Sequence, residues 1–150
     1  DSMTGFYNRN AYDYFIYNEK NIKNYMVVTF DLNNLKMCND NYGHSSGDAY
    51  IIHSAHIIET TFDRFGKCYR IGGDEFCCLI PDAAEFQIER FIQKMQQDIA
   101  ILNNKNIIPT EVGIACGYAL ATPDDADIEK VRERADEMMY HNKKVLKGLI

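Results

Sequence analysis

The sequence predicts an α+β domain in which helices pack on an antiparallel β-sheet. Two observations support this fold class. Short apolar runs of strand length alternate with longer segments whose apolar residues recur every three or four positions, and their order is strand, helix, strand, strand, helix, strand, with a further helix at each end. A chain of 150 residues, 46% of them hydrophobic, is long enough for one domain with its own core.

The first half of the chain contains three predicted elements. A helix is expected at 10–18, where apolar side chains fall on one side. The segment 25–32 is almost continuously apolar, which predicts a strand that is buried on both faces and therefore central in the sheet. A polar loop follows, and spacings of three and four then predict an amphipathic helix at 47–65.

The second half contains the remaining elements. Strands at 68–71 and 76–80 flank a turn whose two glycines are expected to supply positive φ angles. A helix is predicted at 84–102, and a strand at 112–119 alternates bulky with small residues, so that its small face should admit a close neighbour. The last helix is predicted at 122–147, because a capping threonine, a proline and two acids open that segment.

This order is that of ferredoxin-like βαββαβ sheets, and it brings acidic residues together. In a right-handed βαβ unit the two strands are parallel, so their C-terminal ends lie at one edge of the sheet. Asp31 ends the first strand, while Asp74 and Glu75 lie in the turn that leaves the second. Three separate acids often form only a solvated rim, but three acids on one edge favour a site for Mg²⁺ or Mn²⁺ and two-metal phosphoryl transfer.

Charge and cysteine content narrow the function classes. A net charge of −6 without a lysine or arginine run argues against nucleic acid as a partner, so a phosphate-bearing ligand would need metal cations. No apolar stretch is long enough to cross a membrane. Five cysteines without a CxxC pair fit a reducing cytoplasm. The abrupt polar start predicts a domain, 1–150, cut from a longer sensory protein that could itself be anchored in a membrane.

Four motifs, in order, resemble the GGDEF domain of the diguanylate cyclase family and cover essentially the whole chain. Residues 1–9 are similar to D-x-L-T-G-L-x-N-R, and 31–48 follow D-x-D-x-F-K-x-x-N-D-x-x-G-H-x-x-G-D. Residues 70–76, R-I-G-G-D-E-F, contain the signature that names the family. Residues 135–143 resemble A-D-x-A-L-Y-x-A-K.

The resemblance implies condensation of two GTP molecules into cyclic di-GMP with loss of two pyrophosphates. Each subunit of a head-to-head homodimer would hold one GTP and two Mg²⁺ (or Mn²⁺) ions. The implied metal ligands are Asp31, the backbone carbonyl of Leu32, Asp74 and Glu75. The implied catalytic residues are Asp74, Glu75, which would deprotonate the attacking hydroxyl, and Lys36. The implied substrate-binding residues are Asn39 and Asp48 for guanine, Gly72 and Gly73 for close backbone approach, and Lys36, Lys143 and Lys147 for phosphates.

Two departures from the pattern keep an alternative open. Asn33 replaces the second acid of the D-x-D stretch, and Leu35 replaces a usual aromatic residue near the base. The alternative is a catalytically silent GTP-binding module that regulates an attached domain. A pure cyclic di-GMP receptor is disfavoured, because the stretch 63–66 reads D-R-F-G where product-binding relatives have R-x-x-D. A sensory or coiled-coil segment that promotes dimerisation would lie upstream of this chain.

Overall fold

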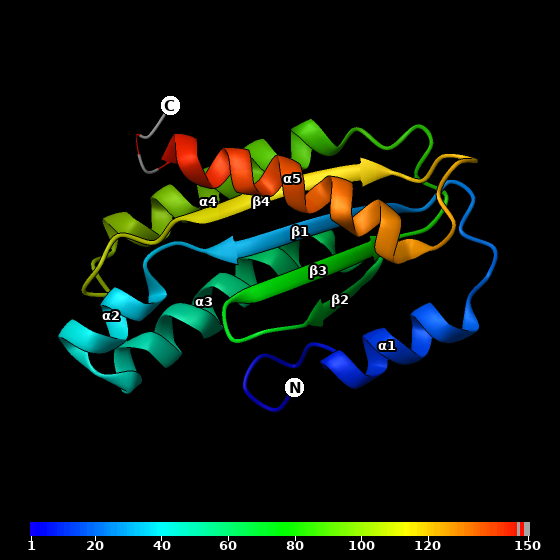
Figure 1. Ribbon diagram of the computed structural model, residues 1–150. Coiled ribbons are helices and arrows are strands. Elements are labelled where there is room, and N and C mark those ends of the chain that lie inside the picture. The colour runs from blue at the N-terminus through cyan, green and yellow to red at the C-terminus, as the bar shows by residue number, and fades with distance from the viewer. Residues whose placement is uncertain (147, 149–150) are drawn as a thin grey trace.

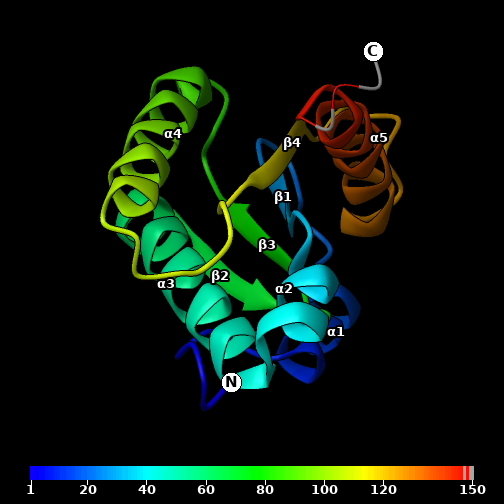
Figure 2. The same ribbon diagram turned by 90° about the vertical axis from the view of Figure 1, so that its left-hand side faces the viewer.

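A computed structural model of the chain describes residues 1–146 and 148. Four strands form one antiparallel sheet in the order β2-β3-β1-β4, and helices cover both of its faces (Figures 1 and 2). Helices α3 and α4 lie on one face, and α1 and α5 on the other. This arrangement confirms the predicted fold class. The elements are α1 (Arg9–Asn18), β1 (Met26–Leu32), α2 (Leu35–Tyr42), α3 (His44–Phe62), β2 (Lys67–Arg70), β3 (Glu75–Ile80), α4 (Ile88–Asn104), β4 (Ile114–Leu120) and α5 (Ile128–Leu146).

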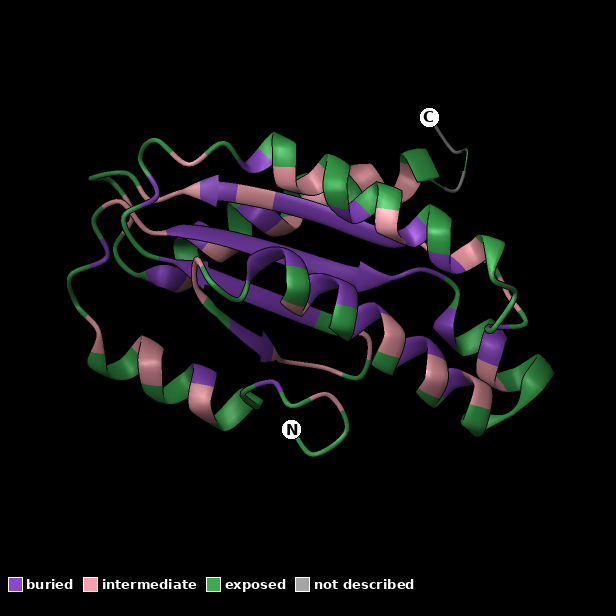
Figure 3. Ribbon diagram, turned by 180° about the vertical axis from the view of Figure 1, so that it is seen from behind, coloured by how far each residue is buried: buried purple, intermediate pink, exposed green. Residues whose placement is uncertain are grey.

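Strand β1 is the centre of the sheet, as its apolar sequence predicted. All of its residues are buried, and it pairs antiparallel with β3 on one side and β4 on the other (Figure 3). Because β2 is antiparallel to β3, β2 runs in the same direction as β1. The turn from β2 to β3 therefore lies at the C-terminal end of β1. The register places Asp31 directly opposite Glu75, which confirms that the topology brings these distant residues together.

A helix, α2, occupies the segment that the sequence indicated as a polar loop. Its composition is largely polar, but Leu35 and Cys38 are buried and anchor one side of it in the core. Gly43 separates α2 from α3 with a φ of 90°, a conformation that glycine adopts without steric cost. Helix α3 consequently starts at His44, earlier than the predicted 47.

The last helix starts later than its sequence predicted. The segment that begins at Thr122 forms a turn instead of a first helical turn, because the Asp125 carboxylate accepts hydrogen bonds from the Thr122 backbone N–H (2.7 Å) and hydroxyl (3.1 Å). The side chain of Asp127 then accepts from the Lys130 N–H at 3.1 Å and caps α5. Among the described residues, no helix is long and apolar enough to cross a membrane.

Helix α5 lies in close contact with the small face of β4, as the alternation of small and bulky residues predicted. A Cβ atom on Gly117 would lie only 2.1 Å from the Ala135 carbonyl oxygen and 2.3 Å from the Met139 nitrogen. The backbone of α5 therefore rests directly on the strand. This contact fixes the distance between α5 and the sheet.

Helix α1 is attached to α5 through a buried tyrosine. Tyr12 is 0% exposed, and its hydroxyl donates a hydrogen bond to the Glu129 carboxylate at 2.6 Å. Arg132 lies 2.9 Å from the other Glu129 oxygen and stacks over the Tyr12 ring. Burial alone would raise the pKa of Glu129, but the hydrogen bonds from Arg132 and Tyr12 outweigh it and hold that pKa below its ordinary value.

Gly117→Ala tests the contact between α5 and β4. The added methyl group would overlap backbone atoms of α5, which cannot move away as a side chain can. We expect the free energy of unfolding to fall by about 1–3 kcal/mol, as for other overpacked cores. Urea denaturation measures the change. Unchanged stability would show that α5 does not rest on Gly117.

Glu129→Gln tests the attachment of α1 under acid conditions. A carboxylate whose folded-state pKa is depressed stabilises the fold above its unfolded pKa, about 4.3, and loses that contribution as the pH falls through the folded value. The variant should therefore be less stable than the parent at pH 7, and the gap should narrow below about pH 4. Urea denaturation at both pH values, with Glu85→Gln at an exposed position as the control, checks this. A gap that is equal at both pH values would contradict the depressed pKa.

Candidate functional site

Five structural elements meet at the C-terminal end of β1. They are β1 itself, the β2–β3 turn, α2, the start of α3 and the C-terminal part of α5 (Figure 1). Asp31 and Glu75 lie on the sheet face that α5 covers, because they share it with Val27 and Cys77 of the α1 and α5 core. The groups on α2 and α3 approach the same end from the opposite face.

Asp31 is a buried carboxylate with a single described cationic partner. It is 7% exposed, and the Lys143 ammonium of α5 donates a hydrogen bond to its Oδ2 atom at 2.6 Å. Its Oδ1 atom is buried and has no partner among the described residues. Burial, and then the nearby Asp74 carboxylate, raise the pKa of Asp31, although the bond from Lys143 opposes them. The Asp31 carboxylate therefore has one oxygen that can still bind another cation.

The signature turn is held by backbone hydrogen bonds and by Arg70. The Leu32 N–H donates to the Asp74 carbonyl at 3.0 Å, which ties the turn to the end of β1. Arg70 donates to the Gly73 carbonyl at 2.8 Å, and it lies 3.3 Å from the Asp1 carboxylate. Sequence reasoning gave Arg70 no role. The sequence did contain an indication of this contact, because Arg70 is the first residue of the signature and Asp1 is the first residue of the first motif.

The glycines of the turn do not have the positive φ angles that were expected. Within the described residues, positive φ among glycines occurs only at Gly5, Gly43 and Gly148. A Cβ atom on Gly73 would meet nothing within 4 Å, whereas one on Gly72 would lie 3.4 Å from the Glu75 side chain. The open space beside Gly73 is where another molecule can approach the backbone.

The three carboxylates are less tightly clustered than the sequence suggested. No group of three or more acidic, histidine or cysteine side chains within residues 1–146 and 148 is arranged to hold a metal ion. Asp31 and Asp74 are close enough for Asp74 to raise the pKa of Asp31. Glu75 is exposed at the start of β3, and its pKa is raised by partial desolvation first and then by the charges of Asp31 and Asp74. Repulsion between neighbouring carboxylates opposes a tighter cluster.

The donor set nevertheless fits a hard divalent cation. All the candidate ligands present oxygen, which Mg²⁺ and Mn²⁺ prefer. The Oδ1 atom of Asp31 is buried without a hydrogen-bond partner among the described residues, so it is free to bind an ion. Asp31, Asp74 and Glu75 could close around an ion after small side-chain movements, since Asp74 and Glu75 are not buried.

A pocket of about 410 Å³ lies between α2, α3 and the signature turn. Five of the predicted residues line it: Lys36, Asn39, Asp48, Gly73 and Asp74. Leu35 and Ile51 add apolar surface, and Arg70 and His44 also contribute to the wall. The pocket thus combines an apolar surface with an amide, carboxylates and cations, which suits a ligand that has both a flat polar ring and phosphate groups.

Gly47 of α3 determines where Asn39 lies. A Cβ atom at this position would fall 1.6 Å from the Asn39 Oδ1 atom, so only glycine allows the carboxamide to rest on α3. Sequence reasoning did not assign this role to Gly47. It depends on the packing of α2 against α3, and α2 itself was not predicted.

The other predicted residues lie outside this pocket. Leu32 is buried within β1, Gly72 lies in the turn with its N–H donating to the Glu75 carbonyl at 3.3 Å, and Lys143 reaches Asp31 from α5. Lys147 lies outside the described residues. Asn33, which replaces an acid of the pattern, is buried, and its backbone carbonyl accepts a hydrogen bond from the Tyr50 hydroxyl at 2.6 Å.

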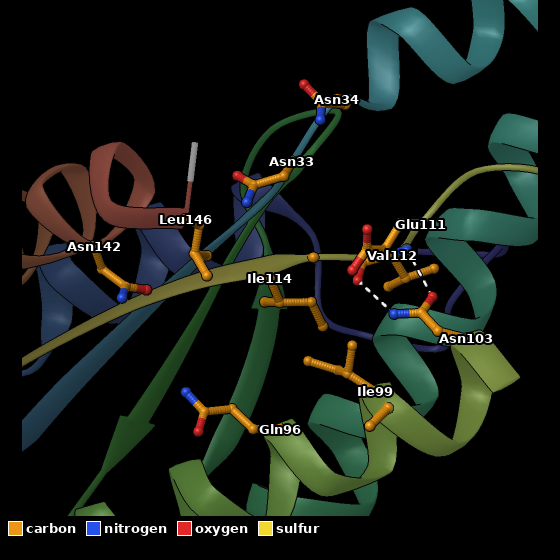
Figure 4. Close-up of a pocket in the computed structure, with 12 residues that line it drawn as sticks. Asn33, Asn34, Gln96, Ile99, Asn103, Glu111, Val112, Ile114, Asn142 and Leu146 are labelled. Carbon is orange, nitrogen blue, oxygen red and sulfur yellow. Dashed lines mark hydrogen bonds between the residues drawn. The ribbon is translucent and has the colours of Figure 1, made fainter. Parts of the chain in front are cut away.

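A second pocket, of about 370 Å³, lies across β4 between α4 and α5 (Figure 4). Its polar lining includes the carboxamides of Asn33, Gln96, Asn103 and Asn142 and the Glu111 carboxylate, and it contains no lysine or arginine among the described residues. This pocket is poorly suited to phosphate groups. We therefore place the candidate site in the pocket beside Asp74.

Comparisons with known proteins show the family of this chain. The family described as "Diguanylate cyclase, GGDEF domain" matches residues 1–147. The chain is 30% identical over 149 residues to diguanylate cyclase DgcN of Escherichia coli, covering 95% of this chain and 36% of that protein. It is 27% identical to diguanylate cyclase DgcS of Shewanella oneidensis, covering 95% of this chain and 49% of that protein. The chain therefore spans less than half the length of these two relatives.

Solved structures share the fold. The coiled-coil and GGDEF domain of DgcB from Caulobacter crescentus, in complex with c-di-GMP, matches with a TM-score of 0.82 at 23% identity, over 96% of this chain and 80% of that one. The GGDEF domain of FimX from Pseudomonas aeruginosa matches with a TM-score of 0.78 at 18% identity, over 96% and 93% of the two chains. Because the family match covers nearly every residue, this chain belongs to the diguanylate cyclase GGDEF domain family.

Proposed function

We propose that this domain is a divalent-metal-dependent diguanylate cyclase that condenses two GTP molecules into cyclic di-GMP and two pyrophosphates. The observation that supports this most is one pocket that joins the proposed base-reading residues, Asn39 and Asp48, to the signature residue Asp74. The names of the two bacterial relatives, and the c-di-GMP bound to the DgcB structure, support the same reaction class.

The α2 and α3 end of the pocket suits guanine. An exposed carboxylate at Asp48 can accept hydrogen bonds from the ring N–H and the exocyclic amine, which adenine does not present as a pair. The Asn39 carboxamide can bond a further polar atom of the base. Leu35 and Ile51 supply apolar surface for the ring.

The other end suits phosphates and cations. Asp31, Asp74, Glu75 and the Leu32 carbonyl would hold two Mg²⁺ or Mn²⁺ ions, which when bound neutralise the triphosphate and lower the pKa of the attacking hydroxyl. Lys36 lines the pocket and would bind phosphate oxygens. Lys143 would do the same after exchanging its bond to Asp31, and Lys147 is proposed for this role from its sequence position alone.

Each half-reaction is an in-line displacement. The 3′-oxygen of one GTP attacks the α-phosphorus of the other, a new P–O bond forms, and the bond to the bridging oxygen breaks as pyrophosphate leaves. Glu75 accepts the proton of the hydroxyl, a role that its raised pKa favours. A repeat of this step with the roles exchanged closes the ring. One chain provides one half-site, so we propose a homodimer with facing sites.

We also propose that the domain acts in the cytoplasm, within a longer protein whose other parts set its activity. All five cysteines are free thiols and buried, as a reducing compartment allows. A similar protein of Staphylococcus saprophyticus, 29% identical over 149 residues, bears the name of an uncharacterised membrane protein. A parent protein attached to a membrane is consistent with that likeness.

A GTP-binding module without activity is the second candidate. It is supported by Asn33, a neutral residue where the family pattern has an acid. Purified protein that binds GTP with Mg²⁺ but forms no cyclic di-GMP, even when dimerised through a fused coiled coil, would favour this module over the enzyme.

Asp74→Asn should lower kcat for cyclic di-GMP formation by at least about a hundredfold, because the metals lose an anionic ligand that carries transition-state charge. The fold should persist, since Asp74 lies in a partly exposed turn. Chromatographic separation of nucleotides after incubation with GTP and Mg²⁺ measures the product. Asp63→Asn, at an exposed position after α3, is the matched control. Turnover of Asp74→Asn at the parental rate would refute the metal-site assignment.

Gly47→Ala should weaken the preference for GTP while leaving the fold intact. The new methyl group displaces the Asn39 side chain, which can move, and removes one hydrogen bond to the base. We expect the GTP-to-ATP ratio of kcat/KM to fall about threefold to tenfold. The neighbouring substitution Ser46→Ala serves as the control. An unchanged ratio would mean that Asn39 does not read the base.

A further inference from the structure

We propose that Asn142 of α5 positions Lys143 by forming a hydrogen bond with the outer edge of β4. The proposal rests on the proposed function in one respect, the role of Lys143 toward GTP phosphates. Asn142 is a distinctive feature of this chain, because the A-D-x-A-L-Y-x-A-K pattern has alanine at this position.

Strand β4 is an edge of the sheet, so its outer backbone groups have no neighbouring strand. Helix α5 supplies their partners from residues spaced four apart. Arg134 donates to the Leu120 carbonyl at 2.9 Å, Met138 Sδ lies 3.5 Å from the Tyr118 nitrogen, and Asn142 Oδ1 accepts from the Cys116 N–H at 3.0 Å. We call these three side chains the edge ladder.

The ladder ends beside the candidate site. Cys116, which Asn142 bonds, follows Ala115, and Ala115 is the register partner of Asp31. Lys143 follows Asn142 and reaches Asp31 at 2.6 Å. The two polar contacts are therefore one residue apart on both the helix and the sheet. A shift of α5 along β4 would break both of them together.

The backbone contact at Gly117 lies before this end of the helix. The contact at Gly117 involves Ala135 and Met139, at least one turn before Lys143. Helix α5 ends at Leu146, one turn after Asn142, and terminal turns of helices fray. Among the described residues, Asn142 is the last of the ladder and the one nearest to Lys143. Figure 4 shows its side chain against the β4 ribbon, at the rim of the second pocket.

The first test needs no nucleotide. In the parent protein, the ion pair with Asp31 should slow acylation of the Lys143 amine, measured by mass spectrometry relative to the exposed Lys130. Asn142→Ala should raise the Lys143 rate relative to Lys130, whereas His141→Ala, at an exposed position on the same turn, should not. A Lys143 rate that is unaltered in Asn142→Ala would overturn the proposal, whether or not the protein binds GTP.

The second test is a double-mutant cycle on binding of a non-hydrolysable GTP analogue with Mg²⁺. Asn142→Ala should weaken binding about threefold to tenfold in the parent, and less than about twofold in the Lys143→Met background. Equal weakening in both backgrounds would mean that Asn142 does not act through Lys143. If the parent fails to bind the analogue while the labelling result holds, the proposed function fails and the positioning role stands.

Discussion

The contact between Lys143 and Asp31 is the interaction on which the candidate site depends. A buried carboxylate is costly unless a cation and hydrogen bonds compensate it, and removing one partner leaves an isolated charge. Here the partners come from elements 112 residues apart in sequence. Strand β1 places Asp31 at the end of the central strand, and α5 can deliver Lys143 only because Gly117 lets the helix rest on β4. The packing of α5 on β4 therefore determines which charges meet in the site.

The negative charge at the C-terminal end of β1 explains why the proposed reaction needs metal ions. The chain carries a net charge of −6, and the pKa values of Asp31 and Glu75 are both raised by loss of hydration and by neighbouring acids. A triphosphate would add further negative charge. Divalent ions between the carboxylates and the phosphates would balance this charge together with the lysines proposed for phosphate binding.

The sequence was sufficient for the fold class and for the meeting of Asp31 with the signature turn, because strand order and handedness determine which ends share an edge. The sequence did not predict α2, because this helix is largely polar and only Leu35 and Cys38 are buried in the core. It also gave no role to Gly47 or Asn142. Their roles are side-chain contacts with other elements, and the local sequence around Gly47 and Asn142 does not indicate those partners. The late start of α5 has a similar cause, since the Thr122–Asp125 turn competes with helix formation through its own hydrogen bonds.

The most direct test of the central claim is to locate a bound metal–nucleotide complex. Mn²⁺ added with a non-hydrolysable GTP analogue broadens the amide signals of nearby residues in an NMR spectrum. We expect selective broadening at Asp31, Asp74 and Glu75, while Met26 and Ile80, which pair at the opposite end of the sheet, keep sharp signals. Broadening centred on the acidic loop at Asp124 and Asp125, or spread evenly over the chain, would contradict it.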